Sequence, residues 1–63
     1  MPNRLRPVRA ERRITQLKLA RLCHMSPSRV WRIENDEYAP TPEERERLSR
    51  VLEIDEKVIW PTN

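Results

Sequence analysis

The stretch TQLKLARLCHMSPSRVWRIE, residues 15–34, carries the signals of two consecutive helices. Thr15 is a favoured N-cap. Ser26 is another, and Pro27 follows it at the first helical position, where a missing N–H costs nothing. Apolar residues at helical spacing give each helix a buried side: Leu19, Ala20 and Cys23 in the first, Val30 and Ile33 in the second. These signals predict helices over about residues 15–22 and 27–34.

The connection between these two helices is short. About three residues, including His24 and Met25, join them, and two helices linked so tightly must cross steeply. Ala20 supplies the small side chain that is needed where two helix axes approach closely. The segment is therefore predicted to form a helix-turn-helix over about residues 15–34. Such a motif lets its second helix, about 27–34, enter the major groove of duplex DNA.

The flanking sequence predicts three further helices. The first runs from about Arg4 or Arg6 to Arg13 with Leu5 and Val8 inward, and Pro7 is tolerated in its first turn. After a loop over residues 35–40, a capping box begins the next helix, whose apolar stripe follows: Thr41, Pro42 and Glu44, then Leu48, Val51 and Leu52. A last short helix is capped by Asp55, contains Val58, Ile59 and Trp60, and stops at Pro61. The expected fold is all-α, one compact domain of five helices over residues 1–63.

The charge of the chain is divided along its length. Residues 1–34 hold nine Lys/Arg and two Glu, a net charge of +7, whereas residues 35–63 hold four Lys/Arg and eight Asp/Glu, a net charge of −4. A basic half joined to an acidic half indicates one face for a polyanion and another turned away from it. Mixed charge that only keeps a small domain soluble would explain the amount of charge but not its segregation.

Several classes of protein are disfavoured. The chain is too short for a deep substrate cavity, and it contains no glycine and no Ser-His-Asp set, so we expect neither an enzyme nor a bound cofactor. Cys23 and His24 have no further Cys or His beside them for a metal site, and Cys23 reads as a core residue. A single cysteine and no long apolar stretch predict a cytoplasmic protein with no membrane contact.

At residues 15–34 the sequence resembles the phage-repressor and Cro type of helix-turn-helix, the lambda repressor-like or XRE type. The matching features are Thr15-Gln16, Leu19-Ala20, the run Met25-Ser26, and Val30 with Ile33-Glu34. The resemblance extends outward through Val8-Arg9, Pro40-Thr41-Pro42 and Leu52-Glu53-Ile54, and it covers about Leu5 to Trp60. It implies the lambda repressor-like fold, a small prokaryotic or phage-encoded, nucleoid-associated regulator of transcription such as a repressor, and an ion pair between Arg9 and Glu34.

Three residues depart from the family pattern. His24 stands where the family usually has a glycine, because the turn takes positive φ, and a non-glycine residue costs roughly 1–2 kcal/mol there. A His24→Gly change is therefore expected to stabilise the domain. Arg45 and Glu53 replace an apolar residue and a turn glycine that are common in the family.

The motif assigns roles to the outer side chains. Gln16 can donate to a phosphate at a helix N-terminus, and in the family it is the backbone clamp. Arg32 is the expected base reader, because arginine pairs with guanine, and Ser28 shares its face. The other expected DNA contacts are Ser26 and Pro27 at the front of the helix, Trp31 on a thymine methyl or the sugar-phosphate wall, and Arg29, Arg12 or Arg13, and Asn35 on phosphates.

Each assignment has an alternative. Arg29 and Arg32 could instead be solvated or paired with Glu residues and have no contact with DNA. Trp31 could equally be partly buried against the first or second helix or touch DNA. The whole domain could instead be a protein-interaction module of the same fold, such as an antitoxin or anti-regulator, which needs an apolar patch in place of a basic recognition face. Trp31 favours this alternative, and Arg29 and Arg32 disfavour it. A homodimer through Val58, Ile59 and Trp60 is expected if the chain dimerises, unless these residues cap its own core. Leu17 and Leu22 are a second possible patch for a dimer.

Overall fold

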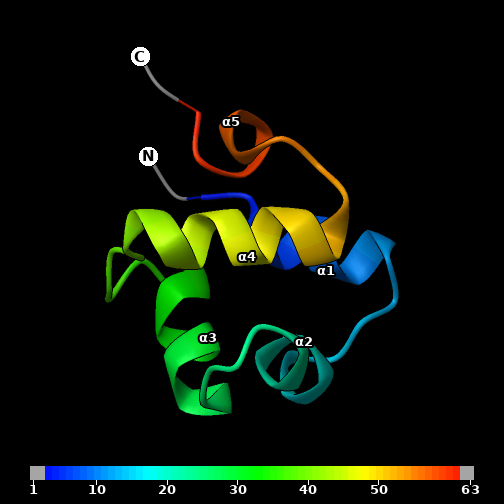
Figure 1. The fold of residues 1–63 in the computed structure, drawn as a ribbon, viewed down its shortest axis with the longest axis vertical. Helices are drawn as coiled ribbons and strands as arrows, with labels where there is room; N and C mark the ends of the chain where they lie inside the picture. The colour runs from blue at the N-terminus through cyan, green and yellow to red at the C-terminus, as the bar shows by residue number, and fades with distance from the viewer. Residues whose placement is uncertain (1–2, 62–63) are drawn as a thin grey trace.

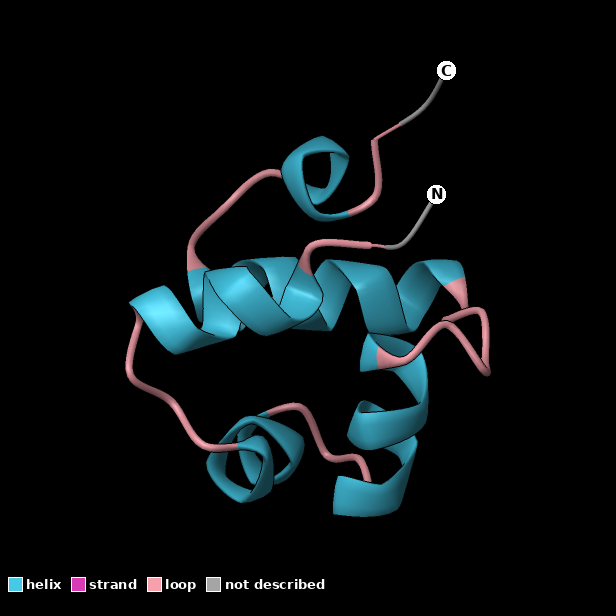
Figure 2. Ribbon diagram, turned by 180° about the vertical axis from the view of Figure 1, so that it is seen from behind, coloured by secondary structure: helices cyan, strands magenta, loops and turns pink. Residues whose placement is uncertain are grey.

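Five helices form the fold in the computed structural model, which describes residues 3–61. They are α1 (Leu5–Glu11), α2 (Gln16–Leu22), α3 (Pro27–Glu34), α4 (Pro42–Leu52) and α5 (Glu56–Ile59). Figure 1 shows α4 across the middle of the molecule with α1 behind it, α2 and α3 on one side and α5 on the other. Figure 2 shows the same order from behind, and only helices and loops occur in the described part. The all-α prediction is confirmed.

Most of the helix starts that the sequence signals are present. The hydroxyl of Thr15 accepts the Lys18 N–H at 3.0 Å, and the hydroxyl of Ser26 accepts the Arg29 N–H at 3.1 Å. Thr41 and Glu44 form the complete capping box at the start of α4. These side chains satisfy N–H groups that have no partner inside a helix, and they fix where α2, α3 and α4 begin.

The first helix ends two residues earlier than predicted. It was expected to reach Arg13, but α1 stops at Glu11, and Arg13 has a φ of 54°. The Ile14 N–H then bonds to the Arg9 carbonyl at 3.3 Å. The chain therefore turns sharply out of α1 instead of continuing the helix.

The same turn closes α1, α2, α3 and α4. The residue that leaves each helix has a φ of 54° or 57°, and these residues are Arg13, His24, Asp36 and Glu53. The following N–H reaches back to a carbonyl of the last turn, as in Ile14 to Arg9, Met25 to Ala20, Glu37 to Arg32 and Ile54 to Ser49. This is the Schellman motif, which normally carries glycine at the left-handed position. The chain has no glycine, so four other residues adopt that conformation.

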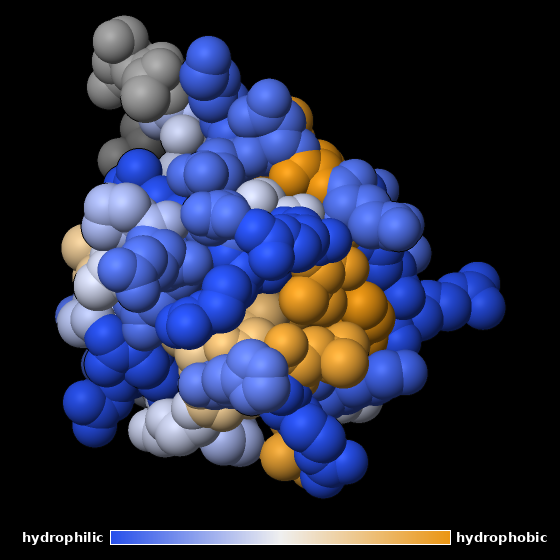
Figure 3. Space-filling view, viewed as in Figure 1, coloured by the Kyte–Doolittle hydropathy of each residue, from blue (hydrophilic) through white to orange (hydrophobic). Residues whose placement is uncertain are grey.

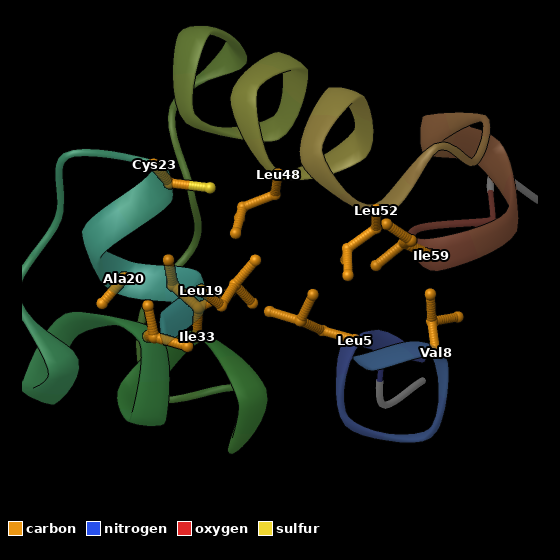
Figure 4. Packing of buried hydrophobic residues seen from close by; sticks show 10 residues of the cluster. Leu5, Val8, Leu19, Ala20, Cys23, Ile33, Leu48, Leu52 and Ile59 are labelled. Carbon is orange, nitrogen blue, oxygen red and sulfur yellow. The ribbon is translucent and has the colours of Figure 1, made fainter. Parts of the chain in front are cut away.

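One apolar core joins all five helices. Figure 4 shows the inward side chains of α1 and α5 meeting α4 at one end, while those of α2 and α3 meet it at the other. Its members are Leu5, Val8, Leu19, Ala20, Cys23, Val30, Ile33, Leu48, Leu52 and Ile59. Cys23 is fully buried, and this burial raises the pKa of its thiol above the ordinary value. The prediction that Cys23 is a core residue is confirmed.

The two helices of the helix-turn-helix pack directly against each other. The contact between α2 and α3 is the most extensive between any two helices, and Ala20 lies fully buried in the core. In Figure 1, α2 is seen nearly end-on while α3 runs vertically in the plane of the picture, so the two helices cross steeply. The outer face of α3 is consequently left free of the other helices.

Candidate nucleic-acid interface

The outer face of α3 carries exposed side chains from two of its turns. Ser28 and Arg32 are exposed one turn apart, and Trp31 beside them is 46% exposed. Within residues 3–61 the Arg32 guanidinium makes no hydrogen bond or ion pair. Trp31 is not a member of the apolar core, and its side chain is partly covered and partly open to solvent.

A depression lies beside this face. It has a volume of about 210 Å³, and its lining residues come from α3, its N-cap and the loop that follows it: Ser26, Ser28, Arg29, Arg32 and Tyr38. Every residue of this lining carries a hydrogen-bond donor in its side chain, and two carry a positive charge. A group with negative charge and several acceptor oxygens matches such a lining.

Arg29 is engaged inside the chain. Its Nε and Nη2 atoms donate to the carboxylate of Glu44, the latter at 3.3 Å, and its guanidinium lies 3.9 Å from the centroid of the Tyr38 ring. Burial raises the pKa of Glu44, but hydrogen bonds from the Thr41 N–H and from Arg29 outweigh burial and hold it below its ordinary value. The alternative in which Arg29 pairs with a Glu residue is therefore realised in this structure.

Gln16 is tied to the base of the motif. Its Nε2 donates to Glu34 Oε1 at 2.8 Å. The Glu34 carboxylate is fully buried and also accepts from Arg9, at 2.5 Å from Nε and 3.2 Å from Nη2. The expected ion pair between Arg9 and Glu34 is confirmed. A carboxamide nitrogen has two N–H groups, so Gln16 keeps one donor for a phosphate.

Asn35 continues this network at the end of α3. Its Oδ1 accepts from Arg6 Nη2 at 3.1 Å, and its Nδ2 donates to the Trp31 carbonyl at 2.7 Å. Asn3 joins from the chain start, where its Nδ2 lies 2.7 Å from the Ile33 carbonyl. The C-terminal end of α3 is thereby fixed to the segment that begins α1.

Arg12 and Arg13, which follow the end of α1, have different surroundings. Arg12 Nε donates to the Leu52 carbonyl at the end of α4, which gives Arg12 a structural contact. Arg13 is exposed, and its side chain has no hydrogen bond or ion pair in the part of the chain that the structure describes. The sequence left the phosphate contact open between these two residues, and the geometry favours Arg13.

The C-terminal surface differs from the predicted dimer patch. Ile59 is fully buried in the core of its own chain, and Trp60 packs against that core, with the Arg45 guanidinium 5.5 Å from the centroid of the Trp60 rings. Val58, 41% exposed, is the most accessible of the three residues, and Trp60 is partly buried. The inclusion of Ile59 in the patch is wrong, because α5 needs an anchor in the core and Ile59 is that anchor.

The predicted apolar patch on α2 is also corrected. Leu17 and Leu22 are 57% and 48% exposed, as expected. Five residues of an α-helix turn through about 500°, so the two side chains leave α2 about 140° apart and do not share a face. Figure 3 does show an apolar area on one side of the molecule, over the border between α2 and α4, with hydrophilic side chains around it.

Tyr38 and Glu44 are the residues of this region that sequence reasoning missed. Glu44 was assigned to a capping box, and nothing in the linear sequence shows that Arg29, fifteen positions earlier, uses the same carboxylate. Tyr38 lies in a loop without periodicity. The one available signal was that it is an aromatic residue in an otherwise polar loop.

Residues 3–61 contain neither a membrane-spanning helix nor a cluster of metal ligands. No helix among residues 3–61 is long and apolar enough to cross a membrane. In the same range, no three His, Cys, Asp or Glu side chains are grouped so that they could hold a metal ion.

Comparison with known proteins gives one match. The family model described as a helix-turn-helix domain matches residues 3–59, nearly the whole chain. The chain belongs to this family, which is of the Cro and repressor type, and membership implies DNA binding. None of the curated proteins compared with the chain matches it.

Proposed function

We propose that this chain is a small transcriptional regulator of the helix-turn-helix domain family that binds specific sequences in double-stranded DNA as one domain. The observation that carries the proposal is the free outer face of α3, where exposed Ser28 and Arg32 lie one turn apart and the Arg32 guanidinium has no partner within residues 3–61. An unpaired arginine on the outer face of a recognition helix is suited to pair with a guanine edge in the major groove.

The proposed DNA contacts fall into two groups, contacts to bases and contacts to phosphates. Arg32 donates to guanine and Ser28 to a neighbouring base, while Trp31 contacts a thymine methyl or the sugar-phosphate wall. Phosphates accept hydrogen bonds from four residues: Gln16, Ser26, Asn35 and Arg13. Pro27 has no N–H to donate and contacts DNA only by packing at the front of α3. This division follows the general pattern in which phosphate contacts position a protein and base contacts specify the sequence.

A selection of duplexes from a random pool, followed by a salt titration, tests the proposal. We expect an enriched sequence, and a binding constant for it that falls log-linearly with salt, because bound cations of the protein displace counterions from the phosphates. Each phosphate that a Lys or Arg side chain neutralises should contribute about −0.9 to the slope of that plot, whereas neutral donors such as Gln16 contribute nothing. Failure to retard any duplex at low salt would refute DNA binding.

A protein-interaction module is the second candidate, and the 46% exposure of the Trp31 side chain favours it. Apolar contacts between proteins depend weakly on salt, in contrast to phosphate contacts. If Trp31→Ala abolished binding to a partner protein while no duplex bound at any salt concentration, this second function would replace the first.

A further inference from the structure

Tyr38 lines the depression beside the recognition helix without belonging to any helix. Its side chain is half-buried and packs against the core. Its hydroxyl has no hydrogen-bond partner within residues 3–61, and it is not among the buried polar atoms that lack one, which shows that the hydroxyl reaches solvent. Because the ring is held by packing while the hydroxyl is open to solvent, Tyr38 presents an unused O–H donor in a defined position.

The position of the Tyr38 ring is set from α4. Glu44, fixed by its capping box with Thr41, holds the Arg29 guanidinium, and Arg29 stacks on the ring at 3.9 Å. These contacts join the start of α4 to the loop after α3. The hydroxyl is consequently held in place before any ligand binds, so little conformational entropy is lost when it makes a hydrogen bond.

The charges around the hydroxyl favour an anion. Arg32 and Ser28 line the same depression, and no carboxylate is part of its lining. The Glu44 carboxylate that contacts Arg29 is compensated by that ion pair. Because Arg32 and Ser28 face the proposed base edges, the DNA backbone that flanks those bases must pass close to the depression.

We propose that Tyr38 donates a hydrogen bond to one backbone phosphate of duplex DNA, beside the bases that Arg32 and Ser28 read, and that Arg29 positions Tyr38 for this contact. The inference rests on the proposed function and adds to it a phosphate contact made by an uncharged side chain.

Tyr38→Phe is the direct test, because it removes the hydroxyl and leaves the ring for Arg29. A hydrogen bond to a charged acceptor predicts about tenfold weaker binding. The loss should be equal on the selected duplex and on a scrambled one, since a phosphate contact carries no sequence information. The salt slope should stay unchanged, because a neutral donor displaces no counterion. Unchanged affinity, with an unfolding midpoint equal to the original, would overturn the proposal.

Duplexes with a single methylphosphonate locate the phosphate. At one position the neutral linkage should weaken DNA binding by the original protein and make its affinity equal to that of Tyr38→Phe. If the two affinities still differed for every position of the linkage, the proposal would also be overturned. Ser49→Ala is the matched control, because it deletes a hydroxyl that bonds only to the Glu46 carbonyl within α4. If the original protein binds no duplex, the proposed function fails; if it binds and Tyr38→Phe binds equally, only the role of Tyr38 fails.

Discussion

Arg32 is the residue on which sequence specificity is proposed to depend. Arg32→Ala should relax the preference between the selected and a scrambled duplex by about 1–3 kcal/mol, while non-specific affinity changes much less. The reason is that a bidentate pair with guanine discriminates between bases, whereas phosphate contacts do not. Competition binding with both duplexes at one salt concentration measures the difference. Equal losses on the two duplexes would show that Arg32 contacts only phosphate.

Glu34 is the polar centre of the fold. Its buried carboxylate accepts from Arg9, Gln16 and, at 3.5 Å, Arg6. Removal of one partner of a buried pair leaves an uncompensated charge, so Arg9→Met should lower the free energy of unfolding by about 3 kcal/mol. The matched control is Arg50→Met, which breaks the exposed pair with Glu46 and should change stability by less than about 0.5 kcal/mol. Urea unfolding of both variants decides; similar midpoints would contradict the argument.

The same carboxylate predicts a pH dependence. Burial raises the pKa of Glu34, but hydrogen bonds from Arg9 and Gln16 outweigh burial and lower it below the ordinary value. A carboxyl group whose pKa is depressed by folding stabilises the native state above its unfolded pKa. That contribution is lost as the pH falls through the native pKa. Unfolding free energies measured from pH 7 downward should therefore decrease below about pH 4.5, and less steeply in Glu34→Gln. An identical slope in both proteins would mean that other carboxyl groups control acid unfolding.

Residue roles were predictable from the sequence where a contact is local or carried by the family pattern. The caps at Thr15 and Ser26 lie three residues from the N–H groups they bind, and the Arg9–Glu34 pair followed from the resemblance. The Arg29–Glu44 pair follows from neither. It depends on how α3 and α4 are placed relative to each other, which side-chain spacing along one helix does not contain.

The turns that end α1 to α4 place non-glycine residues in the left-handed conformation, and the sequence indicates only some of these positions. His24 was recognised because a familiar motif has glycine there, whereas Arg13 and Asp36 were not, and the helix before Arg13 was drawn too long. Glycine marks such turns in most sequences. Without it, the end of a helix must be inferred from the apolar residue after the turn, such as Ile14 or Met25, and that signal is weak.

His24→Gly, Arg13→Gly and Glu53→Gly should each stabilise the protein by about 0.5–1 kcal/mol. Relief of the left-handed strain, roughly 1–2 kcal/mol, exceeds the entropy that glycine adds to the unfolded chain. Asp36→Gly is expected to gain little, because the Asp36 carboxylate accepts from Asn3 Nδ2 at 2.9 Å and that bond is lost. Thermal melts measure the four changes.

His24→Ala serves as the control for those melts. It removes the imidazole but keeps a Cβ at positive φ, so it should bring no gain. If His24→Ala stabilised the protein as much as His24→Gly, the benefit would come from loss of the histidine side chain and not from the backbone.

At the scale of the whole molecule, the two ends have different tasks. Figure 1 places α5 at the opposite end of the molecule from the start of α3, along the 30 Å axis. A change on the exposed side of α5 therefore leaves the proposed DNA face intact.

We expect two copies of the protein to bind one DNA site together. One domain of this size contacts few phosphates, so useful affinity requires two copies on half-sites about 10 bp apart. Since Ile59 is held in the core, the dimer contact that was expected of α5 reduces to Val58 and its surroundings. Val58→Asp should abolish cooperative binding to a duplex with two half-sites, because a charge would be buried at the contact.

The control for this prediction is a duplex with one half-site, to which Val58→Asp should bind with unchanged affinity. Leu17→Asp, at an exposed position on α2, tests whether any new surface charge has the same effect. Gel retardation over a range of protein concentrations separates the outcomes. If Val58→Asp bound both duplexes like the original protein, the second copy would have to be held elsewhere, and the apolar area between α2 and α4 in Figure 3 would be the surface to change next.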